Sequence, residues 1–292
     1  MTRRALGVGR PRPLTFLKDI RFEHTVFALP FAYMTLFLAA DGLPQWQTFL
    51  WITVAMVGAR TFGMAANRLA DAELDGRNSR TARWALPAGR IGAREVWAYS
   101  GVALALLLLA VFNLSPLCRY LWPAVIAAMA FYPYTKRFTW ANHLALGLVY
   151  LMVPTGVWIA VHNGLSLEAV LLGIAAGLWV AGFDTIYACQ DIGFDRREGL
   201  HSLPADFGLG TALTVARLLH MGMVVALFAA GPGLGVGPLY YVGVGATAIL
   251  LHYEHGLVSP QNLSRVNAAF FTMNGLISIF LFLLVAADSV IR

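Results

Sequence analysis

Long apolar runs with almost no charge constrain the fold of this chain more than any other feature. Four of them, which together hold one charged residue, Asp184, are Thr25–Ala40, Val102–Phe112, Leu171–Ile186 and Phe270–Ala287. A helix needs about 20 such residues to cross the apolar core of a bilayer. Over the whole chain, 59% of the residues are hydrophobic and 12% are charged, whereas a soluble domain carries about 25% charged residues. The sequence therefore predicts an integral membrane protein.

The number and length of the apolar runs predict an all-α, multi-pass transmembrane bundle of about nine helices. Because the runs are long and show little alternation, the roughly ten-residue strands of an outer-membrane barrel are excluded. We treat residues 1–292 as one transmembrane domain, in which residues 1–18 form a basic cytoplasmic tail. The expected spans are residues 22–40, 46–67, 95–113, 119–135, 142–162, 166–189, 211–230, 236–254 and 267–287.

Basic residues gather on one side of the expected membrane. With the N-terminus inside, the cytoplasmic segments hold all of the 21 lysines and arginines except Arg60, Arg119, Arg217 and Arg292. This asymmetry sets the orientation of the chain, and together with attraction to anionic headgroups it explains the net charge of +6. Nucleic acid is therefore excluded as a partner, and no obligate protein partner is inferred. We expect a protein of a bacterial or archaeal cell membrane.

Two groups of aspartates end the second and the sixth expected helix. Asn67, Asp71 and Asp75 recur every fourth residue and so share one face of a helix. Asp191 and Asp195 repeat this spacing in the later helix. Carboxylates one turn apart repel each other unless a cation compensates them. Since Mg²⁺ is usually held by one or two carboxylates plus substrate phosphates, the four aspartates predict a cytoplasmic site for Mg²⁺ and a diphosphate.

Other interpretations of the charged residues remain open. The acids could merely solvate helix ends, but more than half of the chain's fifteen acids fall in two matched places: Asp71, Glu73, Asp75, Asp184, Asp191, Asp195, Glu198 and Asp206. Inside the expected spans, Asp184 and Arg60 indicate a functional role or a mutual ion pair. Arginine forks suit phosphate oxygens, and we expect this of Arg68. Lys136 and Arg137 either do the same or only follow the positive-inside rule, to which the other loop arginines are assigned.

Some polar and glycine-rich segments are interpreted as structural. The histidines His143, His162, His220, His252 and His255 show no ligand spacing. The segment Gly231–Pro238 is expected to form an outer turn rather than a phosphate loop, because it lies at the opposite side from the aspartates.

These motifs resemble the UbiA family of intramembrane aromatic prenyltransferases over most of the chain. The first is similar to the family's N-x-x-x-D-x-x-x-D and the second to its D-x-x-x-D, preceded here by Asp184 and Tyr187. Further similarity lies in Arg21–Pro30, Tyr132–Arg137 and Gly199–Pro204.

The resemblance implies transfer of a polyprenyl group from an allylic polyprenyl diphosphate to the ring of a hydroxyaryl carboxylate, in quinone biosynthesis. It implies Mg²⁺ held by Asp71, Asp75, Asp191 and Asp195, with Asp71 and Asp191 as catalytic residues. The isoprenoid tail would need an apolar exit toward membrane lipid. The residues expected to bind substrate are Asn67, Arg68, Lys136, Arg137, Asp184, Tyr187 and His24.

The acceptor stays open between two compounds. The family's 4-hydroxybenzoate enzymes commonly begin the first motif with Asn-Asp, whereas this chain has Asn67-Arg68. That variant is similar to a branch whose acceptor is 1,4-dihydroxy-6-naphthoate. Two other classes are weighed against this one. A secondary transporter would use Asp184 and Arg60 to bind ions, and a CDP-alcohol phosphotransferase would need an aspartate spacing one residue shorter.

Overall fold

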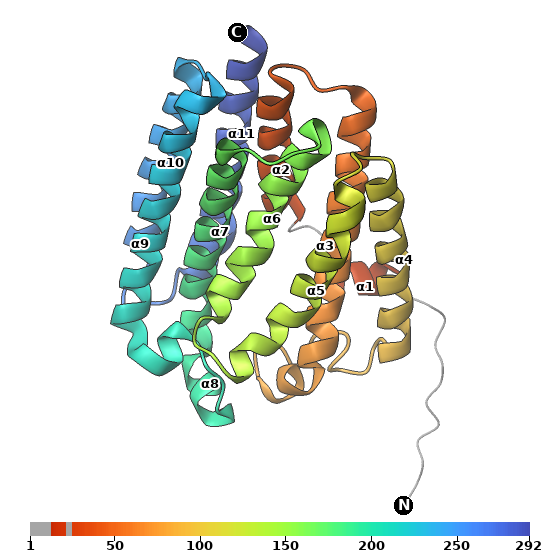
Figure 1. Cartoon of the computed structure of the whole chain (residues 1–292). Helices are drawn as coiled ribbons and strands as arrows, with labels where there is room; N and C mark the ends of the chain where they lie inside the picture. The colour runs from red at the N-terminus through yellow and green to blue at the C-terminus, as the bar shows by residue number, and fades with distance from the viewer. Residues whose placement is uncertain (1–12, 22–24) are drawn as a thin grey trace, which may run out of the picture.

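The computed structural model describes residues 13–21 and 25–292, without the side chains of residues 25–27, and these residues form helices joined by turns and loops (Figure 1). The described residues also contain one isolated antiparallel β-bridge, between Ser259 and Asn262. The helices are α1 (Pro13–Asp19), α2 (Thr25–Ala40), α3 (Trp46–Arg77), α4 (Ala93–Phe112), α5 (Cys118–Phe131), η2 (Tyr132–Arg137), α6 (Asn142–His162), α7 (Leu167–Ala188), η3 (Cys189–Asp191), α8 (Ile192–Glu198), α9 (Leu203–Leu234), α10 (Pro238–Gly256), η4 (Ala268–Met273) and α11 (Asn274–Ile291).

The predicted all-α membrane bundle is confirmed. Each expected span contains a helix within the described residues, and six of the described helices are long and apolar enough to cross a bilayer. The long helices run side by side in alternating directions, so the loop after α3 and the short helix α8 lie at the same end of the bundle (Figure 1). The chain is thus an integral, multi-pass membrane protein.

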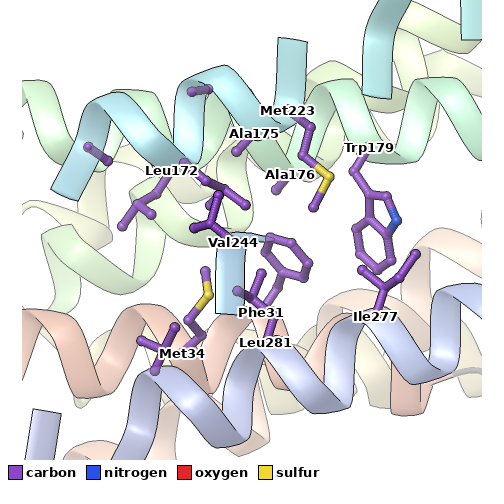
Figure 2. Close-up of a cluster of buried hydrophobic side chains, with 14 of the residues drawn as sticks. Phe31, Met34, Leu172, Ala175, Ala176, Trp179, Met223, Val244, Ile277 and Leu281 are labelled. Atoms are coloured by element: carbon purple, nitrogen blue, oxygen red, sulfur yellow. The ribbon is translucent and has the colours of Figure 1, made fainter. Parts of the chain in front are cut away.

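Helix α7 lies at the centre of the bundle and carries much of its core. Side chains from α2, α7, α9, α10 and α11 pack together around the fully buried Trp179 and Met223 (Figure 2). Small residues let the neighbouring backbones approach closely. A Cβ atom on Gly147 of α6 would lie 2.6 Å from the carbonyl oxygen of Gly177 in α7. The two helices therefore cross at a glycine contact.

Two segments differ from the sequence-based expectation. Helix α9 continues through Gly231 to Leu234, so the outer turn is shorter than predicted and comprises residues 235–237. Gly231 is buried against the Tyr241 ring, and the helix ends at Gly235, whose φ of +60° suits a residue without a side chain. Residues 13–18 of the expected basic tail lie in α1, whose Phe16 is buried. Residues 1–12 of that tail lie outside the described residues.

Candidate active site

A cavity of about 610 Å³ lies between α3, α5, α6 and α7, and Phe270 and Phe271 of η4 also line it. Over most of its length the lining is apolar, with Met56, Leu107, Val125 and Val153 among the residues. At the end near the α3–α4 loop the lining becomes strongly polar. The predicted site residues that line it are Asn67, Arg68, Asp71, Asp75, Lys136, Asp184, Tyr187, Asp191 and Asp195.

The first aspartate motif lies in the last turns of α3. The stretch from Ala66 to Leu74 is rich in Ala, Leu, Arg and Glu, which favour helix, so α3 extends beyond its apolar part and keeps the motif on one face. Asn67 Nδ2 donates to Asp71 Oδ2 over 3.2 Å, and Lys136 Nζ donates to the same oxygen over 2.7 Å. Asp71 Oδ1 and Asp75 Oδ2 are buried without a hydrogen-bond partner among the described residues.

Arg68 is held beneath this motif. Its side chain is 5% exposed, and its Nε donates to the backbone oxygen of Asp19 over 3.0 Å. One terminal nitrogen lies 3.9 Å from Asp75 Oδ2. Burial of a guanidinium is costly unless its donors are satisfied, and the Asp19 oxygen and the Asp75 carboxylate supply that compensation. Arg68 is therefore fixed at the cavity wall.

The second motif begins where α7 tightens into η3 and continues into α8. Asp191 accepts two hydrogen bonds from Arg80, one from Nε over 3.0 Å and one from a terminal nitrogen over 2.5 Å, and a third from Asn78 Nδ2 over 3.0 Å. Asp195 accepts from Ser202 Oγ over 3.0 Å. Because Asn78 and Arg80 follow α3 directly, the α3–α4 loop brings the two motifs together.

Arg80 stays charged in this setting. Burial lowers the pKa of its guanidinium, but the hydrogen bonds and charge of Asp191 outweigh burial and raise the pKa above its ordinary value. A terminal nitrogen also donates to the Tyr187 hydroxyl over 3.2 Å. Tyr187 in turn packs on Phe270 of the π-helix η4, with 4.2 Å between ring centroids. An aromatic wall thus borders the polar end of the cavity.

Deeper in the cavity lies a second polar group. His143 Nδ1 is 2.7 Å from Asp184 Oδ2, and His143 is buried. Its Nε2 and the Nε of Arg60 are buried without a hydrogen-bond partner in the described part of the chain. Both residues line the cavity. Within the described residues Asp184 thus contacts His143 through a hydrogen bond, and no ion pair joins it to Arg60.

Several site residues escaped sequence reasoning, and some expected ones lie elsewhere. His143 was interpreted as structural, because a single histidine carries no spacing signal. Arg80 is interpreted from the sequence as an ordinary positive-inside charge, because one arginine in a basic loop gives no signal of a functional role. Arg137 donates instead to the backbone oxygen of Ala70 over 2.5 Å and is not among the residues that line the cavity. His24 lies outside the described residues.

Taken together, four carboxylates and three cations surround one end of a cavity whose remainder is apolar. Such an arrangement suits an anionic head with an apolar tail. The carboxylates would compete with an anion unless metal ions bridged the two. The deeper group of Arg60, His143 and Asp184 offers a separate place for a second, smaller polar molecule.

Known proteins are similar to this chain in sequence and in fold. The sequence pattern of the UbiA prenyltransferase family matches residues 28–276. The chain is 31% identical over 239 residues to the 4-hydroxybenzoate octaprenyltransferase of Aliivibrio fischeri, covering 82% of this chain and 83% of the relative. It is 33% identical over 243 residues to the protein of the same name from Marinobacter nauticus, covering 83% and 82%.

Solved structures agree. A UbiA homolog from Aeropyrum pernix, in its apo form, superimposes with a TM-score of 0.82 at 34% identity, covering 91% of this chain and 98% of that one. A UbiA homolog from Archaeoglobus fulgidus bound to DMAPP and Mg²⁺ has a TM-score of 0.71 at 17% identity, covering 94% and 98%, and so shares the fold. Because the family pattern spans most of the chain and the aspartate motifs meet in one cavity, the chain belongs to the UbiA prenyltransferase family.

Proposed function

We propose that this prenyltransferase transfers a polyprenyl group from an allylic polyprenyl diphosphate to the ring of a hydroxyaryl carboxylate, as a step in quinone biosynthesis. The observation that carries the proposal is the shape of the cavity, in which both aspartate pairs border one end and the rest is apolar. Support comes from relatives named 4-hydroxybenzoate octaprenyltransferase. Membership of a prenyltransferase family favours the enzyme over the transporter alternative.

Mg²⁺ bound by Asp71, Asp75, Asp191 and Asp195 is part of this proposal. Asp71 Oδ1 and Asp75 Oδ2 are buried without a hydrogen bond among the described residues and fit a cation, since a buried carboxylate oxygen without a hydrogen bond is costly. Within the described residues no three His, Cys, Asp or Glu side chains cluster as a complete metal site. In proteins Mg²⁺ is usually bound by one or two carboxylates, and water and substrate phosphates fill its other coordination positions. The homolog from Archaeoglobus fulgidus bound to DMAPP and Mg²⁺ adds support.

The chain's own residues would bind and orient the diphosphate. Arg68, Arg80 and Lys136 present charged donors at the polar end of the cavity, and such donors bind phosphate oxygens through charge-assisted hydrogen bonds. When bound, Mg²⁺ supplies further stabilisation of the departing diphosphate. The apolar lining excludes water from the allylic cation, which water would otherwise capture. The carbon–oxygen bond to the diphosphate breaks, and a carbon–carbon bond to the acceptor ring forms.

Arg60 and His143 are proposed to hold the acceptor. The Arg60 guanidinium, deep in the cavity, suits a carboxylate. Asp184 fixes the His143 ring through Nδ1, which favours the tautomer with its proton on Nδ1 and leaves Nε2 as an acceptor. Nε2 would then accept the proton of the acceptor's hydroxyl group, and the oxygen left behind makes the ring more electron-rich. After the new carbon–carbon bond has formed, the ring proton passes to the released diphosphate, and the ring regains its aromaticity.

The acceptor and the orientation are the finer parts of the proposal. The names of the relatives favour 4-hydroxybenzoate, and the Asn67-Arg68 pair favours 1,4-dihydroxy-6-naphthoate. The basic residues around the aspartate motifs support a cytoplasmic position for the polar end of the cavity.

The test uses the full chain in lipid nanodiscs with a long-chain prenyl diphosphate and either acceptor, with and without Mg²⁺. We expect a prenylated product with one acceptor, only when Mg²⁺ is present. Asp71→Ala and Asp191→Ala should each lower the rate by at least a hundredfold. Asp41→Ala, an exposed aspartate in the turn after α2, serves as the matched control and should keep the wild-type rate. Full activity of both motif variants would refute the proposed roles.

A further inference from the structure

The indole of Trp84 lies within cation–π range of two guanidinium groups. The Cζ atom of Arg68 is 3.7 Å from the ring centroid, and that of Arg80 is 5.7 Å from it. Arg68 belongs to the first aspartate motif, and Arg80 is paired with Asp191 of the second. Trp84 also lines the cavity. One aromatic ring therefore contacts a cation from each half of the polar end.

Two guanidinium groups at one anion site repel each other, and each must be held in place. Arg68 is anchored from behind by the Asp19 oxygen, which takes its Nε. Arg80 is anchored by Asp191 and Tyr187. The electron-rich face of an indole attracts cations, so the ring offsets part of the repulsion between the arginines. Leucine at this position would keep an apolar side chain but would lack that attraction.

Backbone contacts fix Trp84 independently of the two arginines. Its backbone nitrogen donates to Thr81 O over 2.8 Å, and its oxygen accepts from Ala88 N over 3.0 Å. The next residue, Ala85, is buried and donates its N–H to the Asp19 carboxylate. The side chain of Trp84 can therefore be exchanged while these backbone contacts remain.

We propose that Trp84 is a positioning residue for the diphosphate, which orients Arg68 and Arg80 toward the polar end of the cavity by cation–π contact. This inference rests on the proposed function, because it assumes a diphosphate at that end. The ring itself transfers no proton and touches no reacting atom. Its effect belongs to recognition of the anion and not to the chemical step.

The experiment compares Trp84→Leu and Trp84→Phe in the full chain in nanodiscs. Two quantities are measured: steady-state kinetics with prenyl diphosphate, and binding of inorganic pyrophosphate in the presence of Mg²⁺ by calorimetry. Trp84→Leu should raise the KM for prenyl diphosphate and the Kd for pyrophosphate by about tenfold, in the range of partly desolvated cation–π contacts. The kcat and the KM for the acceptor should change less than about twofold. Trp84→Phe, which keeps an aromatic face, should recover most of the loss.

Trp97→Leu is the matched control, since Trp97 is 63% exposed on α4, and it should behave as wild type. Wild-type values for Trp84→Leu, or equal losses for the leucine and phenylalanine variants, would overturn the inference. A wild-type protein that binds pyrophosphate but transfers no prenyl group would contradict the proposed function alone, because pyrophosphate binding would still test Trp84. A wild-type protein that does neither would contradict both.

Discussion

Replacing Gly147 with alanine should separate α6 from α7 and damage the deeper polar group. The new Cβ would start 2.6 Å from the Gly177 carbonyl oxygen and 3.2 Å from the Cβ of Ala181, and ordinary contact begins at 3.4 Å. The helices must therefore move apart by about 0.8 Å. His143 lies one turn before Gly147, so the same shift would lengthen its 2.7 Å contact with Asp184 to about 3.5 Å, beyond a good hydrogen bond.

Two measurements check this reasoning. Overpacking typically costs about 1–3 kcal/mol, so the midpoint of thermal unfolding in detergent should fall. The KM for the aromatic acceptor should rise severalfold while the KM for prenyl diphosphate changes little, because the aspartate motifs lie farther from the crossing. Gly101→Ala is the control, since a Cβ there meets nothing within 4 Å. If Gly147→Ala keeps both the unfolding midpoint and the acceptor KM of wild type, the close crossing does not position His143.

Two further substitutions probe other contacts. Lys136→Met removes the ammonium group beside the first motif and should raise the KM for prenyl diphosphate by about tenfold, as expected for the loss of one charged donor. Steady-state kinetics would measure this KM, with Lys136→Arg as the conservative variant that keeps the charge. Equal losses in both variants would indicate a purely structural effect. Asn274→Ala leaves the buried Trp179 N–H and one oxygen of Glu254 unpaired, which should cost about 1–3 kcal/mol of stability. Denaturation of this variant beside exposed Gln261→Ala would measure that cost, and equal stability would refute the role.

Regular spacing along a helix makes the direction of a side chain predictable from the sequence. Asp71, Asp75 and Asp191 were predicted to face one site because spacing of four residues puts side chains on one helix face, and the cavity brings them together. Arg80 and Trp84 occupy an irregular loop, where no periodicity links position to direction. Their importance depends on contacts with Asp191 and Arg68 that only the folded bundle creates. The functional roles of the aspartates, of Arg80 and of Trp84 stay predictions.

The apolar runs likewise predicted the helices, but not how α9 ends or how α11 begins. Gly231 remains helical because it packs on Tyr241, a tertiary contact that overrides the turn preference of glycine and proline. The π-helix η4 also left no signal in the sequence. The Asn274 amide donates to two of its backbone oxygens, those of Ala269 and Phe270, and such bonds depend on the widened helix itself.

The loop that joins α3 to α4 has a consequence for exchanging segments between relatives. Asn78 and Arg80 in this loop complete the surroundings of Asp191, far along the chain. Consider a chimera that takes α7 to α9 from another family member but keeps this loop. Its second aspartate motif would come from one parent, and the donors Asn78 and Arg80 would come from the other. Segments on either side of the polar end therefore have to be inherited together, and recombination between them should succeed only when loop and second motif come from the same parent.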